Sequence, residues 1–169
     1  MNAAEYGRML DELGAETIDR YDREESGGQC GKADQLDEYK QGGGAFTFGA
    51  LRRSEQIAVL RALDENLPTR TKRPNRNTGT SYALKHIVER YIGRYTSNLQ
   101  TKTAMRILGY ARSADQLNPV YNVSKREWRA FSDLSNDVED RRSEAHRRMA
   151  RREEQQAAAR YFYKLTKTA

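Results

Sequence analysis

The sequence predicts a mainly α-helical protein. It has a small helix-turn-helix or winged-helix-like centre with a short β-hairpin, an amino-terminal helix and a long carboxy-terminal helix. Three observations predict this fold class. Apolar residues recur at the i, i+3, i+4 spacing of a helical face. Glycine and proline separate these stretches. Leu, Ile, Val and Phe make up only 27 of 169 residues, which indicates a small folded centre with polar extensions.

The first helix is predicted over residues 2–13. Its apolar stripe consists of Tyr6, Met9, Leu10 and Leu13. Gly14 follows, where glycine commonly ends a helix. Up to residue 44 the chain is acidic, rich in glycine and poor in apolar residues, so we predict a loop or a weakly ordered linker. Phe46 and Phe48 are predicted to anchor this linker to the core.

A second helix is predicted over residues 51–66, ending before Pro68. Its buried stripe consists of Ile57, Leu60, Leu63 and Leu67. The following residues 68–79 contain two prolines, two asparagines and four basic side chains. They predict an extended basic arm.

The central module spans residues 78–124. It contains two helical stretches, one capped by Thr80 or Ser81 and ended by Gly93, and one capped by the 96–97 pair and ended by Gly109. Two helices joined by a short glycine-containing turn are typical of a helix-turn-helix. The β-prone segments 109–112 and 119–123 then predict a hairpin, which completes the order of a winged-helix module.

The second helix of this module is predicted to expose polar and basic side chains that hydrogen-bond base edges or phosphates. These candidates are Asn98, Thr101, Lys102 and Arg106, with Arg112 as a phosphate contact near the wing. Nucleic-acid contact, docking on a protein and a purely scaffolding role remain three alternatives for this module.

Charge is distributed unevenly. Residues 1–40 carry a net charge of −6 and residues 41–169 a net charge of +12. The stretch 68–114 alone has ten basic residues and one acid, Glu89, which favours a polyanion or an acidic protein surface as partner. Its basic arm contributes the candidate contacts Arg70, Lys72, Arg73 and Arg76.

The carboxy-terminal helix is predicted to begin after Ser124, with Glu127 completing a capping box. Trp128, Phe131 and Leu134 are predicted to pack on the core. A basic arm, residues 135–169, follows the acidic segment 1–50 and the core 51–134. Three hypotheses compete for the arm: a solvated helix, a helix paired with a partner or with itself in a homodimer, and a helix on a nucleic-acid backbone.

The last hypothesis rests on the spacing of three arginines, which places them on one helical face. They are Arg141, Arg148 and Arg152.

Several classes of protein are excluded on composition. No stretch approaches the roughly 20 apolar residues of a membrane span, and the first residues do not form a secretory signal, so we expect a cytoplasmic protein. Two histidines and one cysteine cannot form a Cys/His zinc site. Because no catalytic motif is found, we expect no enzymatic activity, no cofactor and no metal. His86 is interpreted as a packing or surface residue and Cys30 as incidental.

Three strings carry a resemblance: GTSYALKHIVER at residues 79–90, YTSNLQTKTAMRILGY at 95–110 and NPVYNVS at 118–124. They resemble short proteins encoded by phages and other mobile elements. Several small mobile-element proteins of this size and charge are anti-CRISPR inhibitors. The resemblance implies a phage or plasmid accessory role, in a bacterial host cell, and identifies no active residue.

Two functions from different classes follow. The first is a non-enzymatic accessory protein that binds nucleic acid, DNA more than RNA, through the basic module. The alternative is an anti-CRISPR-type inhibitor that binds an effector nuclease or another nucleoprotein complex and blocks its DNA binding or cleavage. A structural protein of a phage particle is a third hypothesis.

Overall fold

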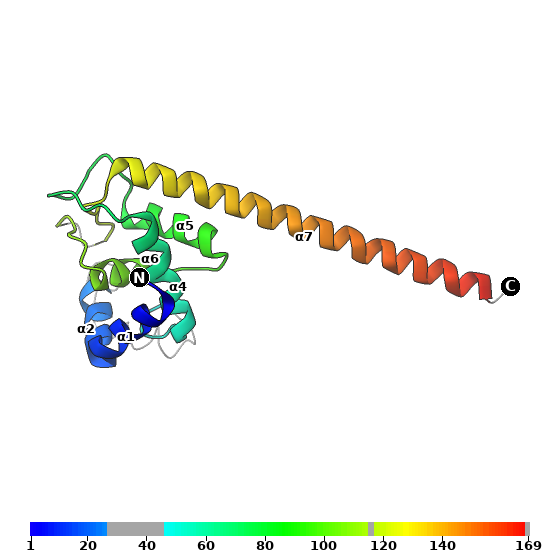
Figure 1. The fold of residues 1–169 in the computed structure, drawn as a ribbon, viewed down its shortest axis with the longest axis horizontal. Coiled ribbons are helices and arrows are strands. Elements are labelled where there is room, and N and C mark those ends of the chain that lie inside the picture. Colours follow the sequence, from blue (N-terminus) through cyan, green and yellow to red (C-terminus); the bar gives the residue numbers. More distant parts are fainter. Residues whose placement is uncertain (27–45, 115–116, 168–169) are drawn as a thin grey trace.

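The computed structural model describes residues 1–26, 46–114 and 117–167, with side chains described up to residue 156. Within these ranges the chain forms the helices α1 (Ala3–Leu13), α2 (Ala15–Ser26), α4 (Arg53–Asn66), α5 (Ser81–Ile92), α6 (Asn98–Ile107) and α7 (Lys125–Lys167) (Figure 1). The prediction of a mainly α-helical protein is confirmed. In the described part of the chain, no helix is both long and apolar enough to cross a bilayer.

The predicted start and end of the first helix are confirmed by its caps. The Asn2 side chain accepts a hydrogen bond from the Glu5 amide at 3.0 Å, and the Glu5 carboxylate accepts one from the Asn2 amide at 2.5 Å. This reciprocal capping box satisfies two amides that the first turn leaves free. At the other end Gly14 takes a positive φ of 75°, which glycine adopts without steric cost.

The end of α5 and the start of α6 follow the predicted pattern, whereas Thr80, at the N-cap position of α5, makes no side-chain capping hydrogen bond. Gly93 ends α5 in the left-handed conformation, with φ 73°. Ser97 begins α6 with a second capping box, because its hydroxyl accepts from the Gln100 amide at 3.0 Å and Gln100 accepts from the Ser97 amide at 2.9 Å. The short connection between these helices is therefore fixed at both ends.

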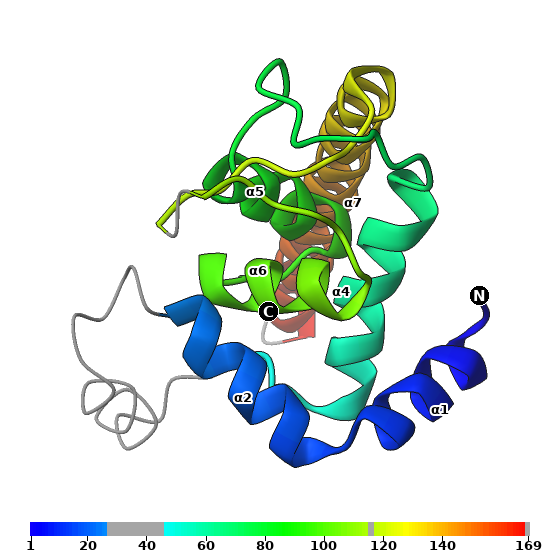
Figure 2. The same ribbon diagram turned by 90° about the vertical axis from the view of Figure 1, so that its left-hand side faces the viewer.

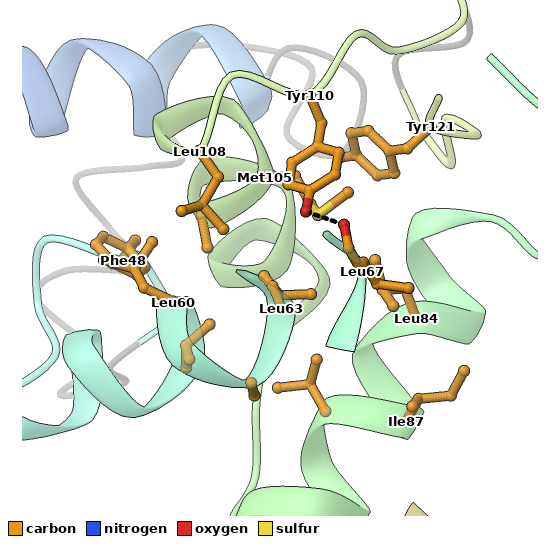
Figure 3. Close-up of a cluster of buried hydrophobic side chains, with 14 of the residues drawn as sticks. Phe48, Leu60, Leu63, Leu67, Leu84, Ile87, Met105, Leu108, Tyr110 and Tyr121 are labelled. Carbon is orange, nitrogen blue, oxygen red and sulfur yellow. Dashed lines mark hydrogen bonds between the residues drawn. The ribbon is translucent and has the colours of Figure 1, made fainter. Parts of the chain in front are cut away.

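The hydrophobic core lies around α4, which contacts α1, α5, α6 and α7 (Figure 2). Leu60 and Leu63 of α4 are fully buried and pack with Leu84 of α5 and Met105 of α6 (Figure 3). At the end of α4, the buried Tyr110 hydroxyl donates to the Leu67 carbonyl at 2.6 Å. Helices distant in sequence thus share one core.

Residues 15–26 form helix α2, so the prediction of a linker is wrong for this segment. α2 packs against α6 (Figure 2), and Asp22 and Glu25 in the second half of α2 accept hydrogen bonds from α6. The linker prediction failed because Ile18 is the only apolar residue of the buried face, which Asp22 and Glu25 continue at helical spacing. The remaining linker residues 27–45, with Cys30 and the triple glycine, lie outside the described residues.

The carboxylate of Asp22 can be buried in the core because hydrogen-bond donors surround it. Its two oxygens accept hydrogen bonds from the Phe48 amide at 3.0 Å, the Gly49 amide at 2.9 Å and the Thr103 hydroxyl at 2.7 Å. Burial raises the pKa of Asp22, while these three donors act in the opposite direction. Phe48 itself is fully buried, which confirms the predicted anchoring role of this residue.

The β-hairpin and the winged-helix module are not supported. Arg112 and Tyr121 pair at one isolated antiparallel bridge, and the described residues contain no strand. The Asn122 side chain hydrogen-bonds two neighbouring backbone groups: it accepts from the Ala111 amide at 2.8 Å and donates to the Thr71 carbonyl at 3.0 Å. Two backbone hydrogen bonds also join the two segments, from the Asn122 amide to the Ala111 carbonyl and from the Ser113 amide to the Val120 carbonyl, each at 2.9 Å. The segments therefore pair locally without forming strands.

α7 runs without interruption through residues 135–137, and its first turns pack on the core. Phe131 is buried and Trp128 is partly buried, as predicted, but Leu134 is 40% exposed, so its predicted packing is wrong. Beyond residue 143 every described side chain of α7 is exposed, and the helix extends away from the other helices (Figure 1). The domain boundaries at 50/51 and 134/135 stay a prediction.

Candidate nucleic-acid interface

Three of the four α6 residues predicted to be exposed, Asn98, Thr101 and Lys102, are buried, so their expected exposure is wrong. Asn98 donates to the Leu117 carbonyl at 3.2 Å, and the Thr101 hydroxyl donates to the Ser97 carbonyl at 3.2 Å. Lys102 is fully buried, and its ammonium donates to the backbone carbonyl of Glu25. In this fold these side chains stabilise the interior and present nothing to a groove of DNA.

Arg106 and Arg112 converge on the buried carboxylate of Glu25. Its Oε1 lies 3.2 Å from the Arg106 guanidinium and 3.4 Å from Arg112 Nε. Arg106 also pairs with Glu24 and lies 4.4 Å from the centre of the Tyr21 ring. The acidic helix α2 therefore neutralises Arg106 and Arg112, two of the residues that the sequence predicted as binding contacts.

Arg70 also makes contacts within the protein. Its guanidinium donates to the Leu108 carbonyl and lies 4.5 Å from the centre of the Tyr110 ring. Because Leu108 follows the last turn of α6, Arg70 supplies a cation at a helix C-terminus, where positive charge is favourable.

The rest of the predicted basic arm is exposed. Lys72, Arg73 and Arg76 lie on the surface, and no ion pair involves them within the described residues. Backbone hydrogen bonds hold their loop against residues 121 and 122. The Thr71 amide donates to the Asn122 carbonyl at 2.8 Å, and the Asn75 amide donates to the Tyr121 carbonyl at 2.9 Å.

The same loop meets the beginning of α7. The Thr69 amide donates to the Glu127 carboxylate at 3.0 Å, and a Cβ at Gly79 would come within 2.5 Å of the Trp128 ring. Three more exposed cations occur on this first part of α7, and the sequence analysis missed them. They are Lys125, Arg126 and Arg129.

Together these residues form the junction surface, defined here as Lys72, Arg73, Arg76, Lys125, Arg126 and Arg129. Five of the six residues lie in two chain segments without Asp or Glu, 67–80 and 117–126, and Arg129 follows about one turn further along α7. Glu127 directly follows the second segment, but its carboxylate accepts the Thr69 amide. The sequence signal for the α7 part of this surface is the pair of basic residues Lys125 and Arg126 at the start of the helix. The prediction for this helix start considered only its capping box.

The three arginines predicted on one face of the arm are on a continuous, exposed helix. Arg141 and Arg152 are exposed, and Arg148 pairs with Glu144 at 2.5 Å. Their neighbour Arg142 turns inward and donates to the Arg90 carbonyl at 3.0 Å and the Tyr91 carbonyl at 3.3 Å. Arg142 thus binds the end of α5, a role that the sequence analysis missed.

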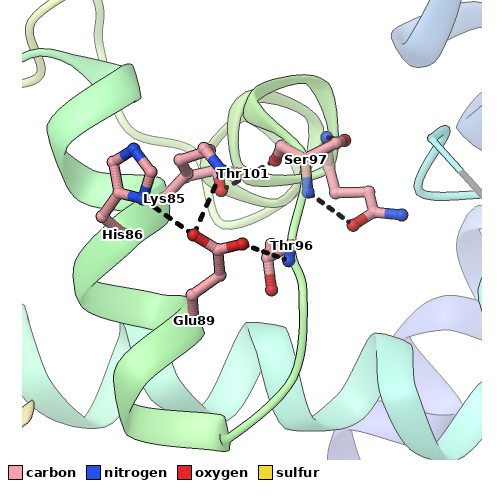
Figure 4. Close-up of polar contacts among 7 residues, drawn as sticks. Lys85, His86, Glu89, Thr96, Ser97 and Thr101 are labelled. Atoms are coloured by element: carbon pink, nitrogen blue, oxygen red, sulfur yellow. Dashed lines mark hydrogen bonds and ion pairs between the residues drawn. The ribbon is translucent and has the colours of Figure 1, made fainter.

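A compact polar cluster centres on Glu89 in the C-terminal half of α5, against the start of α6 (Figure 4). Glu89 accepts from Lys85 Nζ at 3.1 Å and from the Thr96 amide at 3.3 Å, and lies 2.8 Å from His86 Nδ1. Burial raises the pKa of Glu89, but these donors outweigh it and hold the pKa below its ordinary value. His86 is a partly exposed surface residue, as interpreted from the sequence.

The cluster has the chemistry of a structural ion pair. Among the described residues, no group of three or more His, Cys, Asp or Glu side chains is arranged to hold a metal ion.

Comparison of the chain with protein-family models, curated proteins and solved structures found no significant match. The resemblance to phage-encoded proteins therefore stays a prediction. The function has to be inferred from the residues and their geometry.

Proposed function

We propose that this protein acts by binding nucleic acid, DNA in the first place, through the junction surface. The observation that carries the proposal is that six exposed cations lie on the 67–80 loop and the start of α7, which are joined by the hydrogen bond from Thr69 to Glu127. Five of these cations lie in segments without Asp or Glu. Lys and Arg side chains contact phosphate oxygens directly, and neutralising phosphates releases condensed counterions. Such binding needs no catalytic group.

The architecture gives this surface two further properties that favour a polyanion. The backbone dipoles of α7 place a partial positive charge at its first turn, beside Lys125 and Arg126. The backbone that carries Lys72, Arg73 and Arg76 is held by the hydrogen bonds of Thr71 and Asn75, so less backbone freedom is lost when these cations bind.

The α7 arm offers a second set of contacts on the same helix. Arg141, Arg148 and Arg152 are separated by seven and four residues, which brings them to one face of a continuous helix. A backbone that follows this face adds phosphate contacts without reading base sequence. The proposal therefore concerns mainly electrostatic binding with little sequence specificity.

The test is the affinity for a fluorescently labelled 30-base-pair DNA duplex, measured by anisotropy between 50 and 300 mM salt. Six phosphate contacts predict a log–log salt slope of about −5. The triple variant Lys72→Ala, Arg73→Ala, Arg76→Ala should weaken binding more than tenfold and reduce the slope by about three.

A matched control removes three exposed arginines from the opposite, α1–α2–α4 side of the molecule. It combines Arg8→Ala, Arg23→Ala and Arg61→Ala. Equal losses in both triple variants would indicate a general charge effect and contradict the assignment to the junction surface. Absence of binding at 50 mM salt would refute nucleic-acid binding. A nuclease-resistant complex with a host nucleoprotein would then favour the inhibitor alternative.

A further inference from the structure

Two of the large, exposed hydrophobic side chains lie around one buried cation. Tyr82 is 52% exposed and Tyr95 is 58% exposed, whereas Tyr6, Tyr110 and Tyr121 are buried in the core. The Lys85 ammonium lies 5.7 Å from the centre of the Tyr82 ring and 4.7 Å from that of Tyr95. Each ring therefore contacts this cation and still keeps about half of its surface exposed to solvent.

Two more rings extend this pair into a row. His86 meets Tyr82 edge to face with ring centres 4.9 Å apart, and Phe46 meets Tyr95 edge to face at 6.3 Å. We call these four residues, Tyr82, His86, Tyr95 and Phe46, the aromatic platform. Two exposed rings with two partly buried rings beside them differ from the scattered apolar residues of an ordinary surface.

The platform is held in place by polar contacts beneath it. Glu89 binds Lys85 and the Thr96 amide, which fixes the position of the residue next to Tyr95 (Figure 4). On the other side, the Ser97 hydroxyl donates to the Phe46 carbonyl at 2.6 Å. A ligand that stacks on these rings finds them preorganised.

Cations flank the platform on both sides. Arg52 and Arg94 line a hollow of about 470 Å³ together with Phe46, Tyr95 and Glu55. Both arginines pair with Glu55 and keep exposed surface, Arg52 more than Arg94. At the other end, the loop of the junction surface leads directly into α5, in which Tyr82 is the second residue.

From this continuity we infer that the protein binds single-stranded nucleic acid, with unpaired bases stacked on the exposed rings of Tyr82 and Tyr95. The inference rests on the proposed function, because the cations of the junction surface hold the phosphates of the same strand. Only an unpaired strand fits the platform, since the faces of bases inside a duplex are covered by their neighbours. Stacking on aromatic side chains tolerates any base, in keeping with binding that does not depend on sequence.

The experiment compares a labelled 20-nucleotide oligothymidylate with a 20-base-pair duplex, again by anisotropy. The double variant Tyr82→Ala, Tyr95→Ala should bind oligothymidylate at least tenfold more weakly and the duplex within twofold of the wild type. The control Tyr82→Phe, Tyr95→Phe keeps both rings and should bind oligothymidylate within twofold of the wild type. Circular dichroism checks that all variants are folded.

A measurement on the unmodified protein does not depend on the folding of a variant. An oligonucleotide carrying 5-iodouracil, irradiated in the complex, should cross-link to Tyr82 or Tyr95, and mass spectrometry of the peptides locates the link. Cross-links found only at other residues, or unchanged oligothymidylate affinity in the alanine variant, would overturn the stacking inference. Salt-dependent duplex binding would then leave the proposed function standing, whereas no binding to either probe refutes both.

Discussion

Replacing Lys102 by alanine distinguishes a structural role of this residue from a role in binding. Its side chain is fully buried, and its ammonium donates to the Glu25 carbonyl at the end of α2. Loss of three buried methylenes costs about 2 kcal/mol, and the abandoned carbonyl costs roughly 1–3 kcal/mol more. We therefore expect Lys102→Ala to lower the free energy of unfolding by about 3–5 kcal/mol, a large part of a typical domain's stability.

Urea denaturation followed by far-ultraviolet circular dichroism measures this loss, and the melting temperature should fall by roughly 6–20 °C. Lys102→Met keeps most of the buried volume, so it should lose only the hydrogen-bond part, about 1–3 kcal/mol. The matched control is Lys72→Ala, which removes the same charge from an exposed site and should change stability by less than about 0.5 kcal/mol.

The two lysines should give opposite results in the DNA-binding assay. Lys72→Ala should weaken binding while leaving the fold intact, whereas folded Lys102→Ala protein should bind duplex DNA like the wild type. Wild-type stability of Lys102→Ala combined with weakened DNA binding would refute this reasoning. It would mean that α2 does not cover α6 and that α6 itself carries the interface.

Two further changes probe individual contacts. Tyr110→Phe removes the hydroxyl that donates to Leu67, so we expect a loss of about 0.5–1.5 kcal/mol in urea denaturation; wild-type stability would contradict this contact. The hydrogen bond from Arg52 lowers the pKa of Glu55 to about 2, so the stabilisation from this pair is complete above pH 4.5 and is lost as the pH falls towards 2. Carbon-detected NMR titration should show this low midpoint, and Arg52→Ala should move it upward.

Sequence patterning located those helices whose buried face is apolar. The stripe of Tyr6 and Leu10 and the glycines at positions 14 and 93 were sufficient for α1 and α5. α2 was not predicted because its buried face has one apolar residue, Ile18, followed by the acids Asp22 and Glu25. A carboxylate at a core position becomes recognisable only when its donors are known, and these come from residues 26 to 87 positions further along the chain.

The same limitation affected the candidate site. Asn98, Thr101 and Lys102 are polar, so their pattern predicted an exposed face, yet each has a partner inside the protein. Composition could show that the region is basic, but not which cations α2 would neutralise. Which cations stay exposed, such as Arg73 and Arg126, became clear only from the structure, in which the loop and the start of α7 meet.

The length of α7 affects how the molecule moves in solution. Its 43 residues extend over about 65 Å, whereas a compact chain of 169 residues has a radius of gyration near 15 Å. A single copy therefore tumbles anisotropically and diffuses more slowly than a sphere of equal mass. It should leave a gel-filtration column early enough to be mistaken for a dimer, so its stoichiometry needs light scattering or sedimentation equilibrium, which report mass rather than size.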